Sequence, residues 1–306
     1  MIHGELRRFR SGSGDLFNGF FESGRSRTFA RGDLVDGRAR RIFDLMGRAC
    51  EAGVYPYQLP LESRSGPWVS AEGRRLLMLS SYDYLGLIGD TRIDEAAVDA
   101  VRKYGTGTGG VRMLTGTVDL HHEMERQVAK FKGTPRAITF SSGYLANLAV
   151  MASLLTPQDR VILDSLSHRS LVDACRLAGA PLQRFRHNDM ASLENEIVTG
   201  AGSGRTLIVA DGVFSMDGDI CSLPDLIEIK KRHGCFLMID ESHASGVLGA
   251  HGRGTDEHFG VDASEVDIWT GSLAKAIPSN GGFVAGSEEL IIYLQHSAAP
   301  FIFSAA

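Results

Sequence analysis

A lysine that closes a short apolar segment is the residue of this 306-residue chain whose position most suggests chemistry. Residues 267–275 read Asp-Ile-Trp-Thr-Gly-Ser-Leu-Ala-Lys, and a Gly-Gly pair follows at 281–282. An amine at the end of a buried strand is costly to desolvate unless it has a chemical use, such as forming a Schiff base. Lys275 is therefore a candidate catalytic residue, with a solvated lysine at a helix start as the alternative.

A second apolar segment, residues 235–240, ends in the carboxylate Asp240, and His243 follows three residues later. Asp240 could keep a pyridine nitrogen protonated, although aspartate also commonly caps the next element. His243 could donate a hydrogen bond to a phenolic oxygen. A pyridoxal 5'-phosphate (PLP) site needs a lysine and an aspartate at the ends of two strands, so the pair favours this cofactor.

Hydroxyl groups and a second histidine could complete such a site. Residues 141–144, Ser-Ser-Gly-Tyr, join a predicted strand to a predicted helix. Amides and hydroxyls at a helix start can bind phosphate, although a simple N-cap would use the same serines. His168 could stack on a planar ligand or bind a loop carbonyl. Thr270 and Ser272 offer further hydroxyls for phosphate, and both residue types are also common at strand ends.

These residues follow predicted strands that alternate with predicted helices from residue 136 onward. The strands are expected at 137–140, 161–163, 207–210, 236–239 and 268–270. The segments between them are long enough for helical crossovers, so we predict an α/β fold with a mainly parallel sheet and helices on both faces. Small or polar residues follow these strands at 141–143, 164–168, 211–217, 240–243 and 272–275. Because ligands bind beyond the carboxyl ends of such strands, we expect one chemical rim there.

Residues 1–75 are predicted to form an amino-terminal arm. Segments rich in Arg, Gly and Ser at 7–14 and 23–40 suggest weak order, and one helix is expected at 38–52. A short strand is expected at 76–80.

Two further predicted helices flank a glycine-rich segment at 105–112. The first is expected at 93–104, and the second is marked by apolar residues at helical spacing between 120 and 131. A dinucleotide-binding loop would follow a strand, whereas this segment follows a helix. We therefore interpret it as a flexible loop that faces substrate.

Composition argues against several classes of protein. Hydrophobic residues make up 43% of the chain and charged residues 23%, which is ordinary for a globular protein. The net charge of −5 gives no reason to expect nucleic acid or an anionic membrane as a partner. The four cysteines are scattered without a C-x-x-C pair, which fits a reducing cytosol better than disulfides or a zinc site. Since no signal-peptide pattern or apolar run near ~20 residues is present, we expect a cytoplasmic enzyme without a membrane span.

Segments spread from about residue 80 to the end together resemble the α-oxoamine synthases. This family of fold-type I PLP-dependent transferases includes serine palmitoyltransferase and aminooxononanoate synthase. The segments that carry the resemblance are 82–87 (Tyr-Asp-Tyr-Leu-Gly-Leu), 105–116, 142–147, 164–170, 212–218 (Gly-Val-Phe-Ser-Met-Asp-Gly), 240–254 and 272–282. The resemblance implies a PLP-binding large domain at 76–290.

The resemblance also implies a role for each candidate residue. Lys275 would form the internal aldimine with PLP, and Asp240 would pair with the pyridine nitrogen. His243 would contact the 3'-oxygen, and His168 would stack on the ring. The other residues expected around the cofactor are Ser142, Gly143, Tyr144, Ser215, Thr270 and Ser272.

The implied reaction is a decarboxylating condensation. A small amino acid (serine, glycine or alanine) would join an acyl thioester, either acyl-CoA or acyl-carrier protein, to give an α-amino ketone. The alternatives are another fold-type I activity, such as an aldolase or aminotransferase, and a catalytically silent scaffold subunit. By analogy with other fold-type I enzymes we expect a homodimer.

The chain departs from the family pattern in three places. Tyr82 stands where many members have Asn, which favours a serine palmitoyltransferase-like pattern over the simplest short-chain synthases. Pro278 stands at a usual Gly. Residues 291–306 would begin a carboxy-terminal small domain that relatives have in full. We expect this domain to be absent. The chain would then be either a truncation or fragment, or a protein that binds its amino acid differently from the relatives.

Overall fold

The structure, a computed structural model, describes residues 36–53, 57, 59–200 and 204–305. They divide into two compact units. One contains residues 70–76 and the described residues before 64, and the other contains residues 64–69 and 77–305. The segment 7–14 and most of 23–40, for which weak order is expected, lie outside the described residues.

Short elements make up the amino-terminal part. Helix α2 (Asp36–Glu51) lies where the sequence predicts a helix at 38–52. Strands β1 (Trp68–Ala71) and β2 (Arg74–Leu77) form a two-stranded sheet. Glu72 and Gly73 connect them with φ angles of 50° and 66°, and a two-residue type I′ turn requires such positive values. The strand predicted at 76–80 therefore begins earlier and ends at Leu77.

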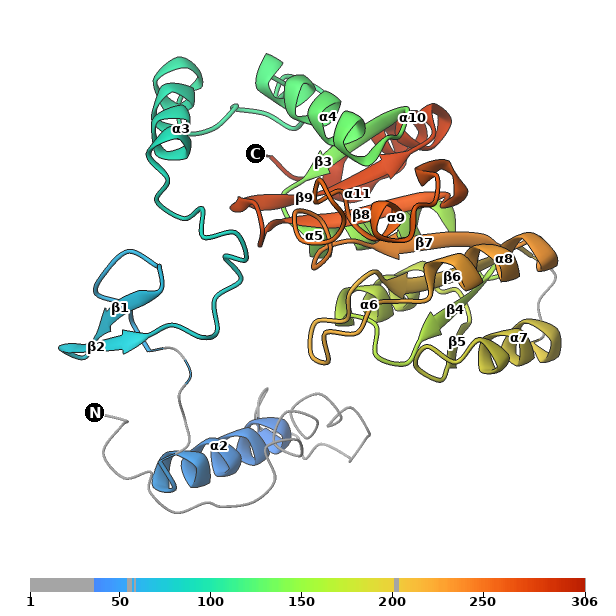
Figure 1. The fold of residues 1–306 in the computed structure, drawn as a ribbon, viewed down its shortest axis with the longest axis horizontal. Coiled ribbons are helices and arrows are strands. Elements are labelled where there is room, and N and C mark those ends of the chain that lie inside the picture. The colour runs from blue at the N-terminus through green and yellow to red at the C-terminus, as the bar shows by residue number, and fades with distance from the viewer. Residues whose placement is uncertain (1–35, 54–56, 58, 201–203, 306) are drawn as a thin grey trace. The chain divides into compact units, whose positions relative to one another are not determined.

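A seven-stranded sheet forms the centre of the second unit (Figure 1). Its strands are β3 (Arg136–Phe140), β4 (Arg160–Asp164), β5 (Leu182–Phe185), β6 (Thr206–Asp211), β7 (Phe236–Asp240), β8 (Ile268–Ala274) and β9 (Pro278–Gly286). Their order across the sheet is β3-β9-β8-β7-β6-β4-β5. β9 runs antiparallel to both neighbours, and every other pairing is parallel. The predicted mainly parallel α/β sheet is confirmed, whereas β5 and the β8–β9 hairpin are absent from the prediction.

Side chains of the central strands alternate between two hydrophobic cores, one on each face of the sheet. In β6, Ile208 belongs to the first core, and Leu207 and Val209 belong to the second. This alternation follows from the two-residue period of a strand. Because both faces are covered, all six residues of β6 are buried, which explains the near-continuous apolar runs in the sequence.

Helices contribute to both cores. α4 (Asp119–Lys132), α7 (Met190–Thr199) and α8 (Leu223–His233) contribute to the first. α5 (Gly143–Leu154), α6 (Arg169–Ala178), α10 (Glu288–Ser297) and α11 (Ala299–Ile302) contribute to the second. The second unit also contains α3 (Thr91–Tyr104) and the five-residue α9 (Thr255–Phe259). Among the described helices, none has both the length and the apolarity needed to cross a membrane.

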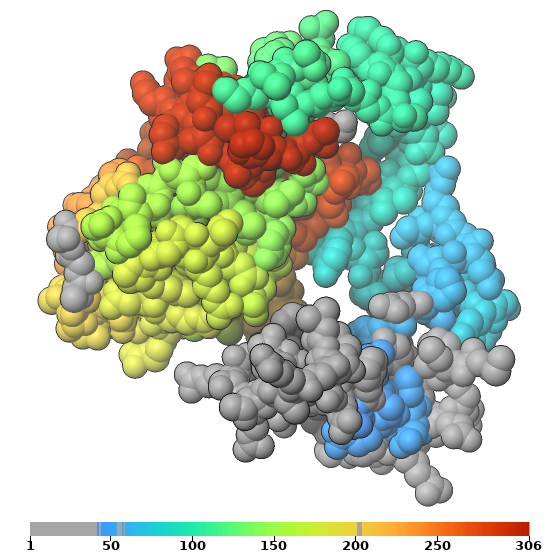
Figure 2. Space-filling view, turned by 180° about the vertical axis from the view of Figure 1, so that it is seen from behind, coloured from blue at the N-terminus to red at the C-terminus, as the bar shows by residue number. Residues whose placement is uncertain are grey.

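The last two helices, α10 and α11, pack on the second face of the sheet. Ile291, Leu294 and Phe301 are buried in the second core, and α11 contacts α5. Figure 2 shows this red segment against the yellow-green segment that contains α5. The described residues from 291 onward, at which we expect a further domain to begin, therefore belong to the same compact unit as the sheet.

Candidate active site

The carboxyl ends of β4, β6, β7 and β8 lead into residues that border one cavity of about 150 Å³. The residues that line it are Ser142, Gly143, Tyr144, Asn147, His168, Ser170, Asp211, Asp240, Ser242, His243, Ser272 and Lys275. Eight of the ten residues predicted to surround a cofactor are among them. Residues that follow the predicted strands therefore line one cavity, as expected.

Lys275 follows the last residue of β8, just beyond an irregularity in the β8–β9 pairing between Ser272 and Ala274. Its Nζ lies 5.9 Å from the centre of the Tyr82 ring. Burial disfavours the charged amine and lowers the pKa of Lys275, although the nearby carboxyl groups of Asp240 and Asp211 act in the opposite direction. A larger share of neutral amine at neutral pH makes Lys275 a better nucleophile toward an aldehyde.

Asp240 is buried at the end of β7 and held at both carboxylate oxygens. Asn147 Nδ2 donates to Asp240 Oδ2 at 2.7 Å, and the backbone N–H of Ser242 donates to Oδ1 at 2.9 Å. Asn147 Nδ2 also donates to Ser170 Oγ at 2.9 Å. These contacts fix the orientation of a carboxylate that lines the cavity, where it could accept a hydrogen bond from a protonated ring nitrogen.

Two histidines in the cavity are held in the neutral form. Burial, and then the positive charge of Lys275, lower the pKa of His243 to about 4, against the opposing effect of Asp240. Burial likewise lowers the pKa of His168. His243 Nδ1 lies 2.7 Å from the hydroxyl of Tyr84. A neutral imidazole suits both predicted tasks, which are hydrogen bonding for His243 and stacking for His168.

Asp211 adds a second acidic group to the cavity, beside Asp240. It pairs in register with Asp240 on the neighbouring parallel strand, and its Oδ2 accepts a 3.0 Å hydrogen bond from the backbone N–H of His168. Burial first, and then the charge of Asp240, raise the pKa of Asp211 well above its usual range. Its buried Oδ1 has no hydrogen-bond partner among the described residues. The raised pKa favours the protonated acid, which would limit the negative charge beside Asp240.

The start of α5 supplies groups that can bind phosphate. Ser142 Oγ accepts a 3.2 Å hydrogen bond from Leu145 N, and the helical pattern begins with the bond from Ala146 N to Ser142 O. The N–H groups of Gly143 and Tyr144 precede that pattern, where a phosphate can accept hydrogen bonds from them. A methyl group on Gly143 would lie 3.1 Å from Ser272 Cβ, so glycine preserves the space between α5 and β8.

The glycine pair at 281–282 explains how β9 passes this helix start. A Cβ on Gly282 would lie 2.4 Å from the backbone nitrogen of Gly143, closer than real Cβ atoms approach. Gly281 has a φ of 123°, a conformation that side chains disfavour. The pair therefore allows β9 and the start of α5 to lie in direct backbone contact beside the cavity.

Two predicted residues lie outside the cavity lining. Thr270 is fully buried within β8, which continues four residues beyond the predicted strand end at 270. Ser215 is exposed in the turn after β6. Their expected contacts with a cofactor remain predictions, because neither residue lines the cavity.

Four lining residues are not among the named candidates: Asn147, Ser170, Asp211 and Ser242. Asp211 and Ser242 do lie in the rim segments expected at 211–217 and 240–243. Asp211 ends an apolar run in the same way as Asp240, so its position carried a signal. Asn147 lies four residues after Gly143, on the same face of α5, and this spacing is a weaker signal. Among the described residues, no group of His, Cys, Asp and Glu side chains could hold a metal ion.

Comparisons with known proteins show which family the chain resembles. A model of the family "Aminotransferase class I and II" matches residues 74–306. The chain is 46% identical over 244 residues to 8-amino-7-oxononanoate synthase 1 of Bacillus velezensis, covering 80% of this chain and 62% of that protein. It is 40% identical over 264 residues to serine palmitoyltransferase of Bacteroides thetaiotaomicron, covering 86% of this chain and 67% of that protein.

The chain is also similar to a solved structure. A serine palmitoyltransferase variant from S. paucimobilis, with a bound PLP–myriocin aldimine, superposes with a TM-score of 0.83 at 33% identity. The match covers 90% of this chain and 69% of that one. The chain thus spans less than two thirds of the length of the Bacillus relative.

Proposed function

This chain belongs to the aminotransferase class I and II family and, within it, to the α-oxoamine synthases; we propose that it catalyses a PLP-dependent, decarboxylating condensation. A small amino acid, serine, glycine or alanine, joins an acyl thioester to give an α-amino ketone, with release of CO2 and of the thiol. The acyl donor is acyl-CoA or an acyl-carrier protein.

One observation carries this proposal: a lysine that follows β8, and an aspartate and a histidine at the end of β7, line the same cavity as a helix start. Lys275, Asp240 and His243 lie with Gly143 around a single space. Other uses of each residue are common, but no single structural role requires all of them together. A nucleophilic amine, a ring acid partner and a phosphate cradle are the requirements of a PLP site.

The residues fit PLP as follows. When bound, PLP supplies an aldehyde that bonds to amines and a ring that delocalises the negative charge left after proton removal. Lys275 Nζ would be the amine for that bond, and the amides at the start of α5 would hold the phosphate. Asp240 would hold a proton on the ring nitrogen, and His243 would donate a hydrogen bond to the ring oxygen.

Proton transfer from the amino acid is assigned to Lys275. Burial lowers the pKa of its amine, which increases the share of the neutral base. The neutral histidines His168 and His243 avoid adding positive charge that would further weaken this base.

Two features of the whole protein belong to the same proposal. We assign the reaction to a homodimer by analogy with fold-type I enzymes. We assign it to the cytoplasm because the four cysteines are all thiols in the structure, and a reducing compartment preserves thiols.

A direct assay tests the proposal. Purified protein with PLP would be mixed with serine, glycine or alanine and an acyl-CoA, and the free CoA thiol and CO2 would be measured. We expect both products to form in equal amounts with at least one amino acid, and neither with the Lys275→Ala variant. Transfer of the amino group to a keto acid, without thiol or CO2 release, would instead identify an aminotransferase.

A further inference from the structure

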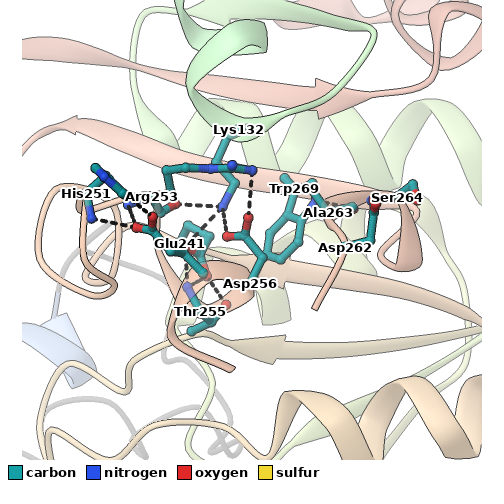
Figure 3. Close-up of polar contacts among 11 residues, drawn as sticks. Lys132, Glu241, His251, Arg253, Thr255, Asp256, Asp262, Ala263, Ser264 and Trp269 are labelled. Atoms are coloured by element: carbon teal, nitrogen blue, oxygen red, sulfur yellow. Dashed lines mark hydrogen bonds and ion pairs between the residues drawn. The ribbon is translucent and has the colours of Figure 1, made fainter. Parts of the chain in front are cut away.

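A buried group of charges is drawn in Figure 3, and none of its residues lines the cavity. Lys132, the last residue of α4, has a fully buried side chain. Its Nζ lies 2.8 Å from Asp256 Oδ1 and 3.3 Å from Glu241 Oε2, and both carboxylates are buried. Arg253 Nη2, 3.2 Å from Asp256 Oδ2, adds a second cation. Lys132 is thus the buried cation that pairs with both carboxylates, as buried charges require, whereas the Arg253 side chain is 38% exposed.

Glu241 connects this charge cluster to the cavity because it directly follows Asp240 in the chain. Its carboxylate accepts hydrogen bonds from the backbone N–H and the hydroxyl of Thr255. A Cβ on Gly254 would lie 1.6 Å from Glu241 Oε2, and one on Gly212 would lie 2.5 Å from Oε1. The carboxylate therefore fills a space that only glycines leave open, between the loop after β6 and the start of α9.

The backbone of Glu241 anchors the turn that carries His243. Its N–H donates to Thr270 O at 2.7 Å. Its carbonyl accepts from Ala244 N at 3.0 Å and from Ser245 N at 2.9 Å. A displacement of Glu241 would therefore move Asp240 on one side and His243 on the other.

Lys132 joins the far end of the same loop to the strand that leads to Lys275. Its Nζ donates to Arg253 O at 2.9 Å and lies 4.0 Å from the centre of the Trp269 ring on β8. Such an ammonium–aromatic contact is attractive, and more so in a desolvated setting. One side chain from α4 thus holds both ends of the loop between β7 and α9, and contacts β8 as well.

We propose that Lys132 is a positioning residue for the cofactor site, acting through Glu241 on Asp240 and His243. The inference rests on the proposed function, because it assigns those two residues to PLP. Lys132 does not line the cavity, so it acts by holding the loop rather than by touching the ligand. Its removal leaves two buried carboxylates facing each other, which would push Glu241 from its place.

The experiment compares Lys132→Met with Lys130→Met, an exposed lysine on the same helix. PLP binding to the cofactor-free proteins would be followed by the visible absorbance band, and the band of each loaded protein would be titrated with pH. We expect Lys132→Met to weaken PLP binding about tenfold, as loss of an outer contact does at metal sites. We also expect it to shift the pH midpoint of the band. Lys130→Met should match the wild type.

Two further variants separate positioning from stability. We expect Lys132→Met to melt at a lower temperature than the wild type, because two buried carboxylates repel each other. In Lys132→Met/Glu241→Gln this repulsion is removed, so the melting temperature should return toward the wild-type value. The pH midpoint of the band should stay shifted. If Lys132→Met does not fold, Glu241→Gln alone is measured in the same way, and it should shift the midpoint. A folded Lys132→Met protein with wild-type PLP affinity and pH midpoint would overturn the proposal, as would an unchanged midpoint in Glu241→Gln.

Failure of the proposed function would look different. If the wild-type protein gives no visible band with PLP, the assignment of the site is wrong, whereas the role of Lys132 in the loop can still be measured. Hydrogen exchange of the cofactor-free protein reports on the amides of Ala244, Ser245 and Thr255, which bond to Glu241. Lys132→Met should speed their exchange and leave amides of α6 unchanged; equal rates in both proteins would overturn the positioning role.

Discussion

Asn147 Nδ2 donates a 2.7 Å hydrogen bond to Asp240 Oδ2, and this contact joins α5 to the carboxyl end of β7. The first residue of α5 is Gly143, where we propose that the phosphate of PLP binds. Asp240 ends β7, where the ring nitrogen of PLP would lie. If PLP binds as proposed, its phosphate would contact α5 and its ring nitrogen would contact β7. The hydrogen bond between Asn147 and Asp240 would then fix the distance between these two contacts.

Replacing Asn147 with Ala should weaken both stability and cofactor binding. Asp240 would lose a hydrogen bond in a buried setting, which costs about 1–3 kcal/mol. Urea unfolding of the cofactor-free protein measures the first effect, and PLP titration the second. Asn195→Ala, at an exposed position of α7, is the matched control. Wild-type PLP affinity in Asn147→Ala would show that Asp240 does not need this support.

Replacing Lys275 with Ala should abolish the visible band of bound PLP, because no other residue of the cavity carries a primary amine. The free energy of unfolding of the cofactor-free variant should not fall by more than about 1 kcal/mol, since the change removes a partly desolvated amine. Absorbance spectra and urea unfolding measure the two effects. Lys103→Ala, at an exposed site on α3, should keep the band. A persistent band in Lys275→Ala would refute the assignment.

The pKa of His243 makes stability depend on pH. It is lowered from 6.5 to about 4 in the folded protein, so the unfolded state binds more protons between these values. Stability from this group is therefore present above pH 6.5 and is lost as the pH falls toward 4. In His243→Gln, the free energy of unfolding should fall by roughly 1 kcal/mol less over this pH range, after allowance for partial exposure of the side chain. Urea unfolding across this range, with His296→Gln as the exposed control, measures it; an unchanged pH slope would contradict the assignment.

Asp211 should affect stability in the opposite direction. Its pKa is raised above 3.8 in the folded protein, so its favourable contribution is complete below that pH. The contribution is lost as the pH rises through the raised value. Asp211→Asn, which mimics the protonated acid, should make the cofactor-free protein more stable at neutral pH. It should also reduce the decrease in the free energy of unfolding as the pH rises. Asp217→Asn, in an exposed turn, is the control. Equal pH profiles for Asp211→Asn and the wild type would argue against a protonated Asp211.

The sequence predicted the buried strands and much of the rim for one physical reason: covered parallel strands are apolar throughout and end in polar residues. Strand β9 was not predicted, because Pro278 and Gly281-Gly282 interrupt its apolar pattern. Those glycines are needed for the contact with α5. Asn147 was not predicted as a site residue, because a polar residue on a helix usually faces solvent. The charge cluster around Lys132 joins segments more than a hundred residues apart, and no local pattern reports such a contact.

The close approach of Gly282 to Gly143 gives a sharp test of how the phosphate side is built. In Gly282→Ala the new methyl group would lie 2.4 Å from Gly143 N and 2.5 Å from Gly143 Cα, so β9 or the start of α5 must move. Overpacking of this kind costs about 1–3 kcal/mol. Because displaced amides bind phosphate less well, PLP affinity should also fall. Gly47→Ala, in α2, is the control, because nothing lies within 4 Å of its added Cβ and alanine favours a helix. Urea unfolding and PLP titration measure both effects, and wild-type values of both in Gly282→Ala would show that this backbone contact does not shape the site.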